Sequence, residues 1–364
     1  MNHPLPASHE QASPRAAGFT PRGEWLAHAR TWMAWPWHPE TFVGTVTEAQ
    51  ADYARVANAI AEFEPVAMVV RPEQETIARR LLSRAIEILA WPVDDAWMRD
   101  IAPNFVVDTQ GRMAGVDWEF NDYGNKDGRN LEGYGEDALT AERILAHLGI
   151  ERYAAPLVCE GGTFVLDGEG TLLTNESVVL NPNRNPGFTR EDAEAVFRDY
   201  LAVDQTIWFA DGLADDDTDG HTDNLVAFAA PGVVLALSED DSGDVNHAPL
   251  RDVHRRLAEA RDARGRGFDV IPVPQPRARY KGKLRLALSY VNFCLVNGGV
   301  LVPAFDDPQR DDYARALIAE QFPGRKALSL PSLAVISGGG SLHCITHEEP
   351  QIIPSPPVRG RGRG

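Results

Sequence analysis

The strongest constraint on the fold is an alternation between amphipathic helical segments and short β-prone runs. In the stretch 47–63, apolar residues such as Val56, Ile60 and Phe63 recur at helical spacing. Helices are expected there and at 73–89, 138–148, 190–201, 250–263 and 311–322. Between the helices, apolar runs predict strands at 66–70, 105–107, 163–166, 178–180, 225–228, 233–237, 270–273, 291–296, 300–302 and 334–337. The alternation indicates an α/β fold.

Composition limits the class of protein. A chain of 364 residues, 43% of them hydrophobic, can bury one large core or two. The net charge of −18 argues against nucleic acid as the main partner and favours the approach of a cationic ligand. No apolar run approaches the length of a membrane span, and the N-terminus shows no signal pattern, so no membrane partner is expected. Three cysteines without a CxxC pair predict a reducing, cytoplasmic setting and no structural zinc.

A glycine-rich stretch near the C-terminus presents a cysteine. It runs from Gly338 to Thr346 with the sequence GGGSLHCIT. Glycines permit positive φ angles and close backbone approach, so a tight turn can expose the sulfur of Cys344 to a ligand. A thiolate is a strong nucleophile. Most free cysteines are small buried hydrophobes, which is the expectation for Cys159 and Cys294, but the preceding turn sets Cys344 apart.

Three further clusters supply charged groups. They are Asp94-Asp95-Ala96-Trp97-Met98-Arg99-Asp100, Glu160-Gly161-Gly162 and Gly220-His221-Thr222-Asp223. If the last of these is a strand, His221 and Asp223 share one face, because alternate side chains point the same way. A histidine beside a carboxylate, with a thiol and further carboxylates elsewhere, suits nucleophilic chemistry on a positively charged carbon.

One acidic segment partly matches the sequence pattern of a calcium-binding loop. Asp215, Asp217, Asp219 and Gly220 match the start of the pattern D-x-D-x-D-G. The twelfth position of such a loop should hold a bidentate glutamate, and here it is Val226. We therefore expect no calcium site there, and no metal elsewhere.

The motifs resemble those of the agmatine deiminase family of guanidine-modifying enzymes. The resemblance rests on Trp97-Met98-Arg99-Asp100, Glu160-Gly161-Gly162, the NPNRNP run at 181–186, Gly220-His221-Thr222-Asp223 and the stretch 338–346, with weaker matches at 31–36 and 289–293. It implies a pentein fold, in which five ββαβ-type units surround a central active site. The expected organisation is then a flexible N-terminus at 1–18, a single pentein catalytic domain at 19–352 and a disordered Pro/Arg/Gly tail at 353–364.

The resemblance also implies a reaction. Agmatine would be hydrolysed to N-carbamoylputrescine and ammonia through a covalent amidino-cysteine intermediate, without a cofactor. Cys344 would be the nucleophile, His221 the general acid and base, and Glu160 the carboxylate that orients the histidine.

The remaining site residues would bind the substrate. Asp100 and Asp223 would grip the guanidinium, since each carboxylate can accept paired N–H donors in fork geometry. Trp97 would either pack in the core or cover the alkyl chain of the substrate. Asp94 would either face the ammonium end of agmatine or serve surface solvation.

Two alternatives stay open. Free arginine or peptidylarginine would be the substrate if an arginine bound a carboxylate or peptide backbone, and Arg184 is the candidate. A non-catalytic pentein binding protein would not need Cys344, His221 and both aspartates together.

The predicted partners are a small cationic guanidine and, in a homo-oligomer, further copies of the chain. The chain departs from the family at Ala102, at Val165 and at His347-Glu348-Glu349, and these changes leave the catalytic set intact.

Overall fold

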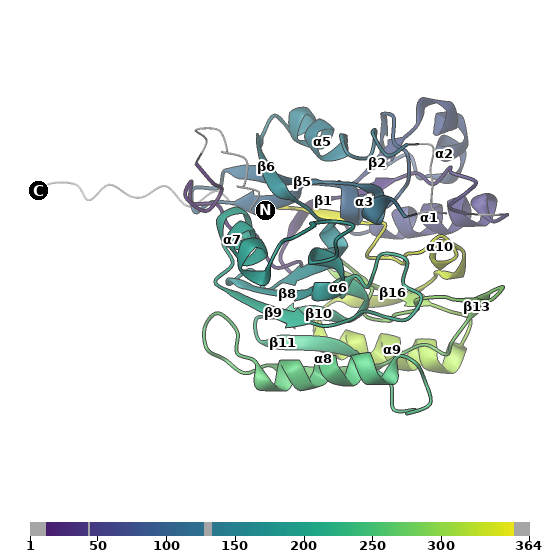
Figure 1. Ribbon diagram of the computed structural model, residues 1–364. Helices are drawn as coiled ribbons and strands as arrows, with labels where there is room; N and C mark the ends of the chain where they lie inside the picture. The colour runs from purple at the N-terminus through teal and green to yellow at the C-terminus, as the bar shows by residue number, and fades with distance from the viewer. Residues whose placement is uncertain (1–11, 43, 127–132, 353–364) are drawn as a thin grey trace, which may run out of the picture.

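The computed structural model describes residues 12–42, 44–126 and 133–352, which form the expected α/β structure (Figure 1). In this part of the chain, five sheets contain three or four strands each. A separate two-stranded hairpin consists of β13 (Tyr280–Lys281) and β14 (Leu284–Arg285).

The four three-stranded sheets share one connectivity. The first strand pairs antiparallel with the second, and the second pairs parallel with the third. Four of the sheets are β4 (Asn104–Val107), β5 (Met113–Glu119) and β6 (Glu151–Val158); β7 (Phe164–Leu166), β8 (Thr171–Asn175) and β9 (Gln205–Phe209); β10 (Val226–Ala230), β11 (Val233–Ser238) and β12 (Asp269–Pro274); and β15 (Cys294–Val296), β16 (Gly299–Ala304) and β17 (Lys326–Pro331). Parallel neighbours need a crossover, and a helix supplies it each time.

Both ends of the described chain build the fifth sheet. β18 (His347–Pro350) pairs antiparallel with β1 (His28–Ala34), and β2 (Val66–Val70) and β3 (Glu87–Ala90) continue the sheet in parallel. Trp32 Nε1 donates a hydrogen bond to Glu349 Oε2 across the pair at 2.9 Å. Strand pairing therefore ties the segment that follows Cys344 to the N-terminal strand.

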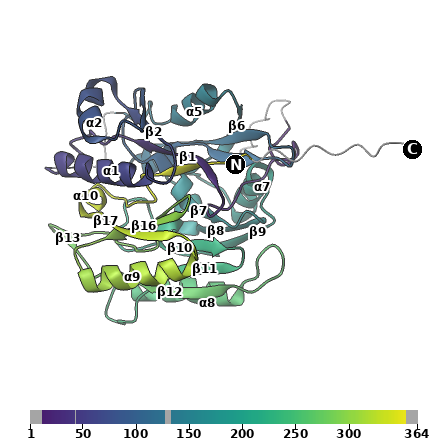
Figure 2. The same ribbon diagram turned by 180° about the vertical axis from the view of Figure 1, so that it is seen from behind.

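The longer helices lie outside the sheets (Figures 1 and 2). They are α1 (Val46–Ile60), α2 (Glu75–Leu81), α5 (Thr140–Leu148), α7 (Arg190–Leu201), α8 (His247–Glu259) and α9 (Pro308–Gln321). α7 begins with a capping box in which Thr189 and Asp192 satisfy each other's backbone N–H groups. α8 buries Leu250, Val253 and Leu257, which recur every three or four residues along one stripe.

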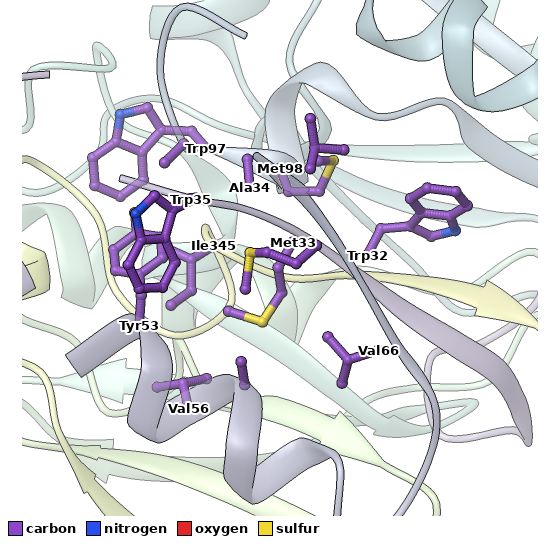
Figure 3. Packing of buried hydrophobic residues seen from close by; sticks show 14 of the residues in the cluster. Trp32, Met33, Ala34, Trp35, Tyr53, Val56, Val66, Trp97, Met98 and Ile345 are labelled. Atoms are coloured by element: carbon purple, nitrogen blue, oxygen red, sulfur yellow. The ribbon is translucent and has the colours of Figure 1, made fainter. Parts of the chain in front are cut away.

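Three apolar clusters form the core of the described residues, and Figure 3 shows part of one. There β1 packs against Tyr53 and Val56 of α1. Trp97 and Ile345 belong to the same cluster. The segments that carry Asp100 and Cys344 are thus anchored on one core.

The structure differs from the expected elements in three places. The helix predicted at 73–89 ends at Leu81, and 87–90 forms the edge strand β3 beside β2. The runs at 178–180 and 334–337 are single helical turns, α6 (Glu176–Val179) and α10 (Leu333–Ile336), and not strands. Short apolar runs fit a buried helix or a buried strand equally well, so tertiary packing decides between them. Nine further strands lie outside the expected runs, and charged or small residues interrupt most of them: β1, β5, β6, β8, β9, β13, β14, β17 and β18.

The N-terminal residues 12–18, for which the sequence predicts flexibility, form a turn. Arg15 donates its backbone N–H to Asp199 O at 3.1 Å, and its guanidinium pairs with Asp204 at 2.8 Å. The predictions for residues 1–11 and for the tail at 353–364 lie outside the described residues. Among the described residues, no helix is both long and apolar enough to cross a membrane.

Candidate active site

Each of the five segments that join one sheet to the next brings a buried polar side chain to the same place. These segments run from β3 to β4, β6 to β7, β9 to β10, β12 to β15 and β17 to β18. Short helical turns occur in four of them: α3 (Met98–Ile101), η2 (Gly161–Thr163), η3 (Thr222–Asn224) and α10 (Leu333–Ile336). The side chains, in chain order, belong to Asp100, Glu160, His221 with Asp223, Asn292 and Cys344. Residues far apart in sequence thereby form one site.

The sulfur of Cys344 faces two polar side chains. Asn292 Nδ2 lies 3.3 Å from Sγ, and Asp223 Oδ2 lies 3.7 Å from it. Burial, together with the charges of Asp223 and Asp100, raises the pKa of Cys344 well above its usual value. The thiol therefore keeps its proton until a cation offsets the carboxylates.

The glycine run before Cys344 is needed for conformation and for space. Gly339 has a φ of +118°, which L-residues rarely adopt. A Cβ atom on Gly340 would lie 2.5 Å from Trp97 Cζ3 and 2.9 Å from Cys344 Cβ. Only glycine at position 340 lets Trp97 pack this closely against the cysteine turn.

His221 lies between two carboxylates. Its Nδ1 is 3.8 Å from Asp100 Oδ1, and its Nε2 is 3.6 Å from Glu160 Oε2. Burial alone would lower the pKa of His221, but Asp100, Glu160 and Asp223 outweigh it and raise the pKa to about 9. The imidazole is therefore protonated at neutral pH. Neither ring nitrogen has a partner within hydrogen-bond distance among the described residues; Nε2 faces Glu160, and Nδ1 faces Asp100.

His221 and Asp223 do not lie on a strand, which corrects the expectation from sequence. His221 immediately precedes η3, and Asp223 lies within this turn. Both residues still belong to the site, because the turn bends the chain ahead of β10. Strand alternation is not the reason that they meet.

Glu160 is held by an arginine. Arg184 Nε donates to Glu160 Oε1 at 2.7 Å, and Thr163 Oγ1 donates to Oε2 at 3.2 Å. Burial would raise the pKa of Glu160, but Arg184 and His221 lower it to about 2. A permanently charged Glu160 beside His221 fits the predicted orienting role.

Arg184 is not placed to bind a substrate carboxylate. Its side chain is fully buried. It pairs with Glu160 and with Asp219 at 2.7 Å each, and donates to Thr218 O at 3.1 Å. The guanidinium is therefore already engaged by the protein, which weakens the free-arginine and peptidylarginine alternatives.

Replacing Arg184 by methionine should lower the free energy of unfolding by about 3–5 kcal/mol, because Glu160 would be left as a buried unpaired charge. Urea titration followed by circular dichroism measures the loss. The control is Arg79→Met, which breaks an exposed pair with Glu75 and should cost less than about 1 kcal/mol. Equal losses in the two variants would contradict a structural role for Arg184.

Asp100 has one oxygen fixed by the backbone and one by a side chain. The Gly162 N–H donates to Oδ1 at 2.9 Å, and the Tyr123 hydroxyl donates to Oδ2 at 3.0 Å. Burial raises the pKa of Asp100 to about 6, with Asp223 adding to this effect and His221 opposing it. Asp100 is therefore largely ionised at neutral pH.

Asp223 is held by a second histidine. His343 Nδ1 lies 2.8 Å from Asp223 Oδ2, and His343 Nε2 lies 3.1 Å from both oxygens of Glu24. Burial and Arg99 would lower the pKa of His343, but Glu24 and Asp223 raise it to about 9. The imidazolium can thus donate from both nitrogens. The other oxygen of Asp223, Oδ1, has no partner among the described residues and can accept from a ligand.

The groups converge beside Gly162. An added Cβ there would approach three of them: His221 Nδ1 at 2.5 Å, Asp100 Oδ1 at 3.0 Å and Asp223 Oδ2 at 3.2 Å. Any side chain at this position would therefore collide with the site. A glycine in the Glu160-Gly161-Gly162 motif is required for that reason.

Trp97 and Asp94 lie in the loop ahead of α3. Trp97 is 4% exposed, and its Nε1 donates to Asp95 Oδ2 at 2.9 Å. Asp94 Oδ2 accepts the Glu136 N–H at 2.8 Å, and Oδ1 lies 3.8 Å from Arg71 Nη1. These contacts tie Asp94 to neighbouring loops, while Trp97 packs directly against the cysteine turn.

Sequence reasoning missed four residues of the site. Asn292 lies within the weak match at 289–293, and His343 directly precedes Cys344, but neither residue is assigned a role from sequence. Glu24 and Tyr123 had none, because only tertiary structure places them beside His343 and Asp100.

A buried thiol, a protonated imidazole and paired carboxylates thus lie together on an α/β fold, an arrangement that suits a hydrolase. The chain belongs to the Porphyromonas-type peptidyl-arginine deiminase family, whose model matches residues 20–350. The agmatine deiminases of Stutzerimonas stutzeri and Ectopseudomonas mendocina are 42% and 41% identical in sequence to this protein. Each alignment covers 93% of this chain and 97% of the relative. The structure of the Enterococcus faecalis agmatine deiminase superposes with a TM-score of 0.91 at 32% identity, covering 95% of this chain and 99% of that one. The predicted relationship to agmatine deiminases is confirmed.

Proposed function

We propose that the protein hydrolyses agmatine to N-carbamoylputrescine and ammonia, acting on a C–N bond of a linear amidine. The observation that carries the proposal is the placement of the Cys344 sulfur beside Asp223 and close to Asp100, with His221 next to Asp100. The similarity to agmatine deiminases over nearly the whole chain supports the same substrate.

The first half-reaction follows from the charges. The guanidinium pairs with Asp100 and Asp223, which removes the field that keeps Cys344 protonated, and the thiol releases its proton to solvent. The Asn292 amide then stabilises the thiolate, which attacks the central carbon of the guanidinium. Protonated His221 gives its proton to a terminal nitrogen, the C–N bond breaks, and ammonia leaves. An amidino group remains bound to sulfur.

The second half-reaction uses the same histidine in reverse. Neutral His221 takes a proton from water, and the resulting hydroxide attacks the amidino carbon. The C–S bond breaks, the thiolate of Cys344 leaves and takes up the hydroxyl proton, and the carbon keeps the oxygen as the carbonyl of a urea. Glu160 stabilises the imidazolium that forms again. One water is consumed, one ammonia is released, and no cofactor takes part.

The proposal extends to the remaining parts of the molecule. Trp97 would cover the alkyl chain of agmatine, and Asp94 would attract its ammonium end. The shared connectivity of the sheets supports a closed five-bladed pentein arrangement over residues 19–352. Free thiols at Cys159, Cys294 and Cys344 support a reducing, cytoplasmic setting. Assembly into a homo-oligomer stays a prediction.

The function is tested by assaying ammonia release from agmatine, free arginine and an N-acetylated arginyl peptide. Agmatine should be turned over with a kcat/KM about 10²-fold or more above the others, because Arg184, the candidate partner for a carboxylate or peptide group, is already paired with Glu160 and Asp219. Turnover of the peptide alone would refute the substrate assignment. Absence of ammonia from all three would favour the non-catalytic alternative.

The pH profile of kcat/KM for agmatine should be bell-shaped. It should fall below a pH of about 6, where Asp100 gains a proton and no longer binds the cation, and above about 9, where His221 loses the proton that it gives to ammonia. Because these groups interact, the two limbs report apparent values for the cluster. An alkaline limb near neutral pH would contradict a protonated resting His221.

A further inference from the structure

A left-handed turn lies beside the site. The segment α4 (Asp122–Asn125) has φ angles of +55° at Asp122, +53° at Tyr123, +89° at Gly124 and +47° at Asn125. Left-handed conformation is unfavourable for L-residues and usually occurs singly. Aspartate and asparagine tolerate this conformation, so the strain falls mainly on Tyr123, which the surroundings must hold in place.

Contacts on both sides of the turn hold it in place. Asn121 Oδ1 accepts the Gly124 N–H at 2.9 Å, and Asn121 Nδ2 donates to Asn183 O at 2.8 Å. Lys126 Nζ lies 2.6 Å from Asp219 Oδ1. Asn183 and Asp219 also bind Arg184, so the turn is attached to the same network that holds Glu160.

The left-handed turn fixes the position of one side chain, that of Tyr123. Tyr123 is buried, and its hydroxyl donates to Asp100 Oδ2 at 3.0 Å. Its ring lies 5.9 Å from the His221 ring and 5.4 Å from the Phe120 ring. Because Gly162 holds the other oxygen of Asp100, the tyrosine completes the fixation of that carboxylate.

We propose that Tyr123 is a positioning residue, held by the left-handed turn, that fixes the plane of Asp100 and favours its ionised form for binding a guanidinium. The inference rests on the proposed function and adds to it a residue outside the motifs that carry the family resemblance. A hydroxyl that donates to a carboxylate favours the charged form. Other groups also affect the protonation of Asp100: burial, Asp223 and Glu160 raise its pKa, and His221, at 3.8 Å, lowers it.

The test is Tyr123→Phe, which removes one oxygen and keeps the ring. A lost hydrogen bond to a charged group should raise KM for agmatine about 10- to 100-fold, with kcat changed less than about threefold. The acid limb of kcat/KM should move to higher pH by about one to two units, because Asp100 loses a donor that favours ionisation. In a Cys344→Ser background, calorimetry should show weaker agmatine binding by the same factor.

The matched control is Phe120→Leu. This substitution loosens the packing around Tyr123 but removes no hydrogen bond to Asp100, because phenylalanine has no donor. A merely structural role for Tyr123 predicts similar KM changes in both variants and an unmoved acid limb, and either result would overturn the inference. If wild-type protein releases no ammonia from agmatine, the proposed function fails first. If wild type is active and Tyr123→Phe matches it, only the positioning role fails.

Discussion

Replacing Cys344 by serine is expected to lower kcat for agmatine by about 10⁴-fold or more while the protein stays folded. Serine keeps nearly the same shape, but its hydroxyl is a far weaker nucleophile than a thiolate. Asp100 and Asp223 remain in place to bind the cation, so agmatine should still bind. Steady-state ammonia release measures the first effect, and calorimetry measures the second.

The other two cysteines provide controls. Cys159 and Cys294 are buried, and the sulfur of each contacts the backbone carbonyl of the next residue, whereas the sulfur of Cys344 faces Asn292 and Asp223. Alanine at either position should leave kcat within about threefold, since neither thiol takes part in the proposed chemistry. Near-complete loss of activity in a folded Cys294→Ala variant would mean that the nucleophile has been misassigned.

Replacing His221 by asparagine should lower kcat about 10³- to 10⁴-fold. The variant loses the proton donor for the departing nitrogen and the base for the second half-reaction. Asparagine cannot titrate, so the residual rate should also lose the alkaline limb near pH 9 that His221 supplies. Stopped assays of ammonia across the pH range measure both effects.

A second histidine serves as the control for that experiment. His254 lies on α8, where its Nε2 is 3.0 Å from Leu237 O, and the mechanism does not use it. His254→Asn should keep the wild-type rate and pH profile. A His221→Asn variant with an unchanged alkaline limb would assign that limb to another group, such as His343.

The side chains that meet at the candidate site could be predicted because short motifs carry them. A thiol after a glycine turn, a histidine near an aspartate and a carboxylate before two glycines each constrain function locally. The structure then shows why the glycines are needed: Gly340 admits Trp97, and Gly162 leaves room for the histidine and both aspartates.

The supporting residues could not be predicted, because their roles depend on which segments meet. Arg184 is a plausible carboxylate clamp in sequence, yet it is buried against Glu160. The hydrogen bonds of Glu24 with His343 and of Tyr123 with Asp100 join distant segments. In the same way, the α/β class follows from periodicity, but the closing of β1 against β18 depends on tertiary pairing.

The most direct test of the central claim is mass spectrometry of protein quenched in acid during agmatine turnover. The account predicts an adduct on Cys344 with the mass of agmatine less one ammonia, and its absence from Cys344→Ser protein treated in the same way. An adduct on another residue, or turnover without any adduct under conditions where the second half-reaction is slowed, would contradict covalent catalysis by Cys344.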